Sequence, residues 1–247
     1  MATTPTNGFA LSWRGTRMRV LVLAPHTDDA EFGCGGTIAR LVAEGHEVHS
    51  AAFSSCEESI PPGFPKDALA REMFEAAAVL GVPRERVRLF EYRVRRFSER
   101  RQDILEELVR LARELKPDLV LMPSLQDTHQ DHQVIAQEAP RAFKQTTILS
   151  YDMPWNTPAF TTQAFVELRP EHLQRKLAAI RRYHSQRHRP YAKPAFLRGL
   201  ASTRGGPAGL ERAEAFEIIR WVVPASAARP SRADAARTAR RAATTWT

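Results

Sequence analysis

The chain alternates between short apolar runs and segments whose apolar residues recur at helical spacing. Residues 18–24 form a nearly continuous apolar run rich in β-branched side chains, which is typical of a strand buried on both faces. Residues 37–44 show helical spacing, and Gly45 follows where a helix commonly ends. A second apolar run covers residues 47–53. Together these segments predict a strand–helix–strand unit that begins a parallel sheet.

The same alternation continues almost to the end of the chain. It predicts further helices at 66–80, 101–115, 134–143 and 170–184, and further strands at 87–90, 119–122, 148–150, 164–168 and 215–222. Strands that alternate with helices favour the α/β class, here a three-layer sandwich with a mainly parallel sheet and helices on both faces. We expect one folded domain over residues 17–223, preceded by a flexible lead-in at 1–16.

The net charge of +8 is concentrated in the last part of the chain. Residues 224–247 hold five arginines and one aspartate, so half of the excess charge lies there. This segment is rich in Ala, Pro, Ser and Thr and has no apolar periodicity, which predicts a basic disordered tail. A nucleic-acid partner is not expected, because basic residues interleaved with aromatic ones on a folded face are missing from the pattern.

Composition also restricts the cellular setting. No run approaches the roughly 18–20 apolar residues of a membrane span. The first residues have neither the basic start nor the apolar stretch of a signal peptide, so we expect a cytoplasmic protein. Cys34 and Cys56 are too few for a disulfide framework, and their spacing does not indicate cysteine-bound zinc.

Two polar clusters follow predicted strands. Residues 25–29 read Pro-His-Thr-Asp-Asp and come directly after the first strand, and residues 127–132 read Asp-Thr-His-Gln-Asp-His after the strand at 119–122. Ligands of open parallel sheets bind beyond the carboxyl ends of the strands. If both strands belong to one sheet, the two clusters meet at one edge of it.

The residue types in these clusters are those of a catalytic zinc site. Such a site takes three protein ligands from histidines and carboxylates and keeps one position for water. His26, Asp29 and His132 would supply two imidazoles and one carboxylate, and Asp28 would accept a proton from the water. The alternative is that these are ordinary polar loop residues, with the two aspartates capping a helix.

Two further residues of the second cluster have suggested roles. His129 lies three positions before His132, so it can face the same pocket and stabilise the oxyanion that forms when water adds to an amide carbonyl. Asp131 would accept a hydrogen bond from an imidazole and fix its orientation.

The two clusters resemble the signatures of a known family. Residues 26–37, His-Thr-Asp-Asp-Ala-Glu-Phe-Gly-Cys-Gly-Gly-Thr, and residues 129–132, His-Gln-Asp-His, resemble those of the PIG-L/LmbE-like zinc-dependent N-deacetylases. The likeness extends to residues 47–54, 71–72 and 213–217, and so covers most of 18–222. One departure is Thr27, where the family most often has proline; a stiff turn is lost there, but no ligand.

This resemblance implies a Rossmann-like fold and removal of an acetyl group from an amino sugar such as N-acetylglucosamine. It implies His26, Asp29 and His132 as ligands of one Zn²⁺, Asp28 as general base and His129 as the oxyanion or leaving-group partner. Because related enzymes often assemble as trimers or hexamers, a homo-oligomer stays open. So do two other functions, an amidase acting on another N-acyl substrate and a sugar- or nucleotide-binding protein without activity.

Residues that contact the substrate are harder to predict. Arg71 resembles a family arginine that reaches the sugar, with a surface ion pair as the alternative. The basic stretch that contains Arg93, Arg95 and Arg96 suits phosphate recognition or, alternatively, a solvated face. His184 is a candidate for the pocket lining or for a helix cap.

Overall fold

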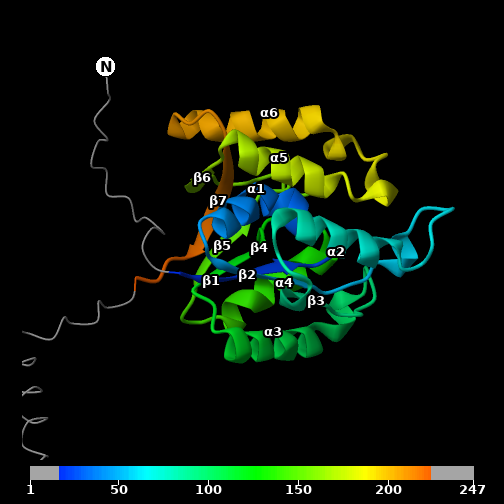
Figure 1. Ribbon diagram of the computed structural model, residues 1–247. Helices are drawn as coiled ribbons and strands as arrows, with labels where there is room; N and C mark the ends of the chain where they lie inside the picture. The colour runs from blue at the N-terminus through cyan, green and yellow to red at the C-terminus, as the bar shows by residue number, and fades with distance from the viewer. Residues whose placement is uncertain (1–16, 224–247) are drawn as a thin grey trace, which may run out of the picture.

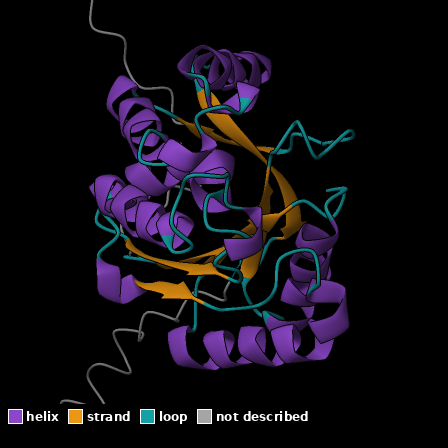
Figure 2. Cartoon of the chain, turned by 90° about the vertical axis from the view of Figure 1, so that its right-hand side faces the viewer, coloured by secondary structure: helices purple, strands orange, loops and turns teal. Residues whose placement is uncertain are grey.

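The computed structural model describes residues 17–223, which form one seven-stranded sheet between two layers of helices (Figures 1 and 2). The spatial order of the strands is β3-β2-β1-β4-β5-β7-β6. Pairing is parallel from β3 to β5, whereas β7 is antiparallel to both of its neighbours. The strands are β1 (Arg19–Ala24), β2 (Glu47–Ala52), β3 (Val87–Leu89), β4 (Leu119–Pro123), β5 (Thr147–Tyr151), β6 (Ala164–Glu167) and β7 (Ala213–Arg220).

Helices cover both faces of this sheet, so the predicted α/β sandwich with a mainly parallel sheet is confirmed. One layer consists of α1 (Asp29–Ala43), α2 (Ala68–Leu80), α5 (Pro170–Ile180) and α6 (Pro194–Gly205), and the other of α3 (Arg101–Leu115) and α4 (Gln130–Ala142) (Figure 1). The predicted flexible segments 1–16 and 224–247 lie outside the described residues. No helix within residues 17–223 is long and apolar enough to cross a membrane.

The interior strand β1 shows how the sequence specifies this arrangement. Its alternate side chains point to opposite faces, so Val20 and Val22 pack under α1 and α5, while Leu21 and Leu23 pack against α3 and α4. All four are at most 1% exposed. Burial of each contributes about 1.5–3 kcal/mol, and a strand that is apolar on both faces is stable only between two helical layers.

Helix α1 begins at Asp29, eight residues before the predicted start. Its glycines lower the intrinsic helix propensity of this segment. They are nevertheless needed, because neighbouring side chains leave no room for a Cβ at Gly33. A Cβ at Gly33 would lie 2.4 Å from the Tyr151 ring. The helix kinks at Cys34, where φ is −143°, and the carboxylate of Glu214 accepts the backbone N–H of the two residues after Gly35. Partners distant in sequence therefore build this helix.

Helix α6 was not predicted from the sequence. Its buried residues are Leu197, Ala201 and Gly205, which follow one another at intervals of four. Only one of these is a large apolar side chain, so the amphipathic signal is weak. Pro194 at its first position gives a helical start without a required N–H donor.

Candidate metal centre and catalytic site

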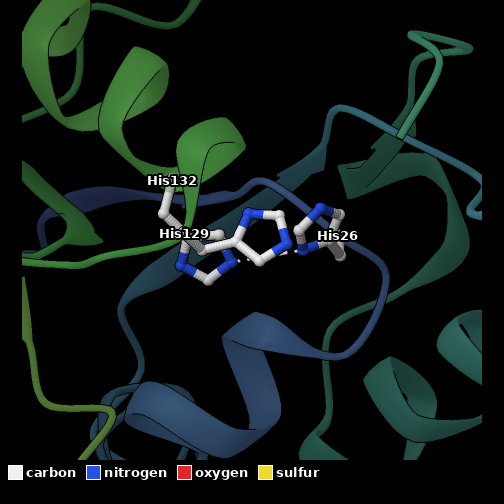
Figure 3. Close-up of side chains that lie close together, drawn as sticks. All are labelled: His26, His129 and His132. Carbon is white, nitrogen blue, oxygen red and sulfur yellow. Dashed lines mark hydrogen bonds between the residues drawn. The ribbon is translucent and has the colours of Figure 1, made fainter. Parts of the chain in front are cut away.

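The two polar clusters meet because β1 and β4 are neighbours in the sheet. The segment after β1 carries His26 and leads into α1, whose first residue is Asp29. The segment after β4 leads to α4, which has His132 in its first turn. Figure 3 shows the rings of His26, His129 and His132 gathered at this edge of the sheet.

Three donor atoms form a nearly equilateral triangle. The Nδ1 atom of His26 lies 3.2 Å from the Nε2 atom of His132, and the Oδ2 atom of Asp29 lies 3.2 Å from each of them. Tetrahedral zinc with ligands at about 2.1 Å separates those ligands by about 3.4 Å. The spacing and the donor types therefore fit one such ion.

Three histidines form a second possible set of metal ligands. Ring nitrogens of His26, His129 and His132 all lie within 4.8 Å of one another. This all-imidazole set is looser than the 3.2 Å triangle that includes Asp29. In addition, the Nδ1 atom of His129 already accepts a hydrogen bond from the backbone N–H of Asp131 (3.2 Å). We therefore assign the better fit to the set with the carboxylate.

Each of the two imidazoles in the triangle contacts a carboxylate through its other ring nitrogen. The Nδ1 atom of His132 lies 2.7 Å from Oδ2 of Asp127, and the Nε2 atom of His26 lies 3.0 Å from Oδ2 of Asp131. Such contacts place the ring proton on the outer nitrogen and leave the inner lone pair free for a cation. The sequence suggested this contact for Asp131 but gave no role to Asp127, although it opens the same cluster.

Charge at the triangle favours a cation. Burial opposes ionisation of Asp29, but His132 and His26 outweigh it and hold the pKa well below its ordinary value. Burial likewise opposes protonation of His132, yet Asp29 and Asp127 raise its pKa to about 10. Asp29 is therefore ionised, and its negative charge, with that of Asp127, stabilises positive charge at this point.

Asp28 lies beside the triangle and lines the same cavity. No side chain among residues 17–223 donates a hydrogen bond to its carboxylate. Burial and the neighbouring Asp29 raise its pKa to about 6. Asp28 is therefore a carboxylate able to exchange a proton near neutral pH.

His129 also lines the cavity, as a neutral ring. Burial, together with repulsion from His26 and His132, lowers its pKa to about 4. Because its Nδ1 atom accepts from the backbone, the proton of the neutral ring is on Nε2. His129 therefore offers one N–H donor.

The turn that carries Asp28 is fixed by a buried tyrosine. The hydroxyl of Tyr183 lies 2.6 Å from the carbonyl oxygen of Thr27 and 2.9 Å from Oε2 of Glu31. A carbonyl only accepts, so the hydroxyl donates to Thr27 and Glu31 must donate to the hydroxyl. This requires a protonated Glu31, in agreement with burial that raises its pKa to about 8.

The cavity in front of the triangle has a volume of about 300 Å³, and one wall of it is aromatic. The rings of Trp155 and Tyr191 are stacked, with centroids 4.1 Å apart and planes 7° from parallel. Phe32 meets both of them edge-on. The cavity therefore combines a polar end at the histidines with an aromatic side.

Four residues that the sequence suggested as substrate contacts lie outside this cavity. Arg71 is exposed and pairs with Asp67 at 3.2 Å on α2, which is a surface ion pair. His184 is exposed at the start of a 3₁₀ turn. The other two, both exposed and paired with glutamates, are Arg93 and Arg96.

Two other arginines line the cavity instead, Arg95 and Arg189. Arg95 belongs to the basic stretch that the sequence singled out. Arg189 lies after α5 in a stretch without a recognisable pattern, so no sequence signal could have singled it out.

The chain matches a known protein family over the segment that contains both polar clusters. A model of the PIG-L family, described as GlcNAc-PI de-N-acetylase, matches residues 21–143, which contain both polar clusters. The uncharacterized deacetylase YaiS of Escherichia coli K12 is 24% identical over 188 residues, covering 71% of this chain and 95% of YaiS.

Solved structures share the fold at low identity. The N,N'-diacetylchitobiose deacetylase of Pyrococcus horikoshii is 24% identical with a TM-score of 0.66, over 82% of this chain and 84% of that one. GalB of Pseudomonas putida KT2440, a 4-carboxy-2-hydroxymuconate hydratase, is 20% identical with a TM-score of 0.68, over 85% of this chain and 99% of that one. The fold thus carries more than one activity, and it is the family match at the polar clusters that identifies the chain as a member of the PIG-L family.

Proposed function

We propose that this protein is a zinc-dependent N-deacetylase that acts on an N-acetylated amino sugar. The observation that carries the proposal is the triangle of His26, Asp29 and His132 donors at 3.2 Å. Its support includes the family match and the deacetylase names of YaiS and of the Pyrococcus enzyme. The likeness to a hydratase makes a direct assay necessary.

In this proposal His26, Asp29 and His132 hold the zinc ion. A bound zinc ion lowers the pKa of water toward about 7 and polarises a carbonyl group. Asp127 and Asp131 keep the two imidazoles in the tautomer that binds a cation.

Asp28 and His129 carry the proton and charge steps. Asp28 takes one proton from the water that attacks the acetamide carbon. The N–H of His129 donates to the amide oxygen as that oxygen gains negative charge. When the C–N bond breaks, Asp28 returns its proton to the departing nitrogen, so the acetamide and water become acetic acid and an amine, which then exist as acetate and an ammonium group.

The aromatic wall suits a ring substrate. The stacked pair of Trp155 and Tyr191 presents a flat surface to the cavity, against which the apolar face of a sugar ring can pack. The cavity volume of about 300 Å³ matches the lower end of small-molecule sites.

The experiment is acetate release from N-acetylglucosamine derivatives by zinc-loaded protein. Asp28→Asn should retain zinc and lose turnover by about 10²–10⁴-fold, because a positioned base contributes that much. Asp103→Asn, on the outer helix α3, is the matched control and should keep wild-type turnover. Wild-type turnover in Asp28→Asn, or no acetate from any N-acetyl sugar, would overturn the proposal.

A further inference from the structure

Arginines near the catalytic cavity differ in whether a carboxylate neutralises them. Arg71, Arg93 and Arg96 are paired with acidic side chains and lie outside the cavity. Arg95 and Arg189 line the cavity, and neither forms an ion pair with any residue in 17–223. The two arginines of the cavity lining are thus the ones without an ion-pair partner among residues 17–223.

The backbone of Arg95 is held against the metal-binding residues. Its φ is 65°, a left-handed conformation that costs a residue with a side chain about 1 kcal/mol or more. The carboxylate of Asp131 accepts the backbone N–H of Arg95 and, 3.2 Å away, that of Phe97. The same carboxylate contacts His26. Asp131 therefore fixes one histidine and the loop that brings Arg95 to the cavity.

Arg189 is anchored by a chain of hydrogen bonds from α2. The buried carboxylate of Glu72 accepts from the hydroxyl of Ser185 at 2.6 Å, and that oxygen accepts from the amide of Gln186 at 3.3 Å. The Nε atom of Arg189 in turn donates to the Gln186 side-chain oxygen at 3.2 Å. This leaves both terminal nitrogens of Arg189 without a protein acceptor among the described residues, a fork suited to an oxyanion.

The net charge of the residues that line the cavity also favours an anionic ligand. Its lining contains two carboxylates, Asp28 and Asp29, and two guanidinium groups. With the divalent ion of the proposed function in place, the lining is positive overall. Arg189 also acts electrostatically on Asp28 and on Tyr191, which places its charge close to the base and to the aromatic wall.

We propose that Arg95 and Arg189 form an oxyanion subsite, so that the substrate is an N-acetyl amino sugar carrying a phosphate or a carboxylate. This rests on the proposed function. The sugar ring packs on the Trp155–Tyr191 wall while the anionic group binds the guanidinium groups. Charge-assisted bonds of this kind change affinity by about 10- to 100-fold.

The test compares neutral N-acetylglucosamine, its 1- and 6-phosphates and N-acetylmuramic acid, which carries a carboxylate. We expect kcat/KM of zinc-loaded protein to be at least about 10-fold higher for a phosphate or a carboxylate sugar than for the neutral one. Arg189→Gln and Arg95→Gln should lower kcat/KM for the anionic sugars by at least about 10-fold more than kcat/KM for the neutral sugar, which removes the preference. Arg187→Gln, an exposed neighbour outside the cavity, is the control and should keep the preference.

Binding to the zinc-loaded Asp28→Asn protein, measured by calorimetry, separates this proposal from the proposed function. Tighter binding of an anionic sugar that Arg189→Gln abolishes, with no acetate released by the wild type, would retain the subsite and reject the deacetylase. Acetate release with equal kcat/KM for neutral and anionic sugars would retain the deacetylase and reject the subsite. An equal loss for both kinds of sugar in Arg189→Gln would also reject it, because that arginine would then act through Asp28.

Discussion

Replacement of Asp127 by asparagine tests how the ligands of the proposed zinc ion are held. The Oδ2 atom of Asp127 lies 2.7 Å from Nδ1 of His132, and both side chains are only 1% exposed. The variant keeps the shape and a neutral acceptor but removes the charge that makes the imidazole a stronger ligand. Loss of such a partner weakens metal binding by about 10- to 100-fold, or about 1.4–2.7 kcal/mol.

Competition with a chromophoric chelator measures this change directly. Asp118→Asn is the matched control, because Asp118 flanks the opposite end of β4 and its carboxylate accepts, within residues 17–223, only the backbone N–H of Arg19. Its zinc affinity should equal that of the wild type. Circular dichroism verifies that both variants fold. Wild-type zinc affinity in folded Asp127→Asn would mean that the carboxylate next to His132 does not strengthen zinc binding.

Two further predictions concern stability. Gly33→Ala should lower the free energy of unfolding by about 1–3 kcal/mol, because the added Cβ would clash with the Tyr151 ring. Gly199→Ala in α6 is the matched control, because its added Cβ would have no neighbour within 4 Å. This variant should raise the free energy of unfolding by about 0.5–1 kcal/mol. Urea unfolding that ranks the two variants the other way would contradict the packing. The raised pKa of Glu31, about 8 against an ordinary 4.5, means that the folded state holds one more proton than the unfolded state between these values. The stability contributed by Glu31 therefore falls as pH rises through that window. In Glu31→Gln the amide donates to Tyr183 at every pH, so its free energy of unfolding should depend less on pH than that of the wild type. Identical pH profiles of the two proteins would mean that Glu31 is ionised.

Much of the fold was predictable because the decisive signals are local. The apolar run of β1 and the one of β4 each lead directly into polar residues, and parallel strands bring their carboxyl ends to one edge. That rule alone places residues 25–29 beside residues 127–132, as the pairing of Val22 with Leu121 bears out.

Features set by distant contacts were not predictable in this way. The start of α1 depends on Glu214 and on the Tyr151 ring, 118 or more positions away from Gly33. Likewise, Arg189 reaches the cavity through Gln186 and Ser185, whose anchor is Glu72 on another helix. Arg71 was the more conspicuous residue in the sequence, but in α2 its neighbour Glu72 faces inward and Arg71 faces solvent.

The most direct test is a crystal structure of the zinc-loaded protein, with anomalous scattering recorded at the zinc edge. We expect one strong peak, about 2.0–2.2 Å from Nδ1 of His26, Nε2 of His132 and a carboxylate oxygen of Asp29. A peak bound by His26, His129 and His132 with Asp29 outside its coordination shell, or no peak at this edge of the sheet, would contradict it.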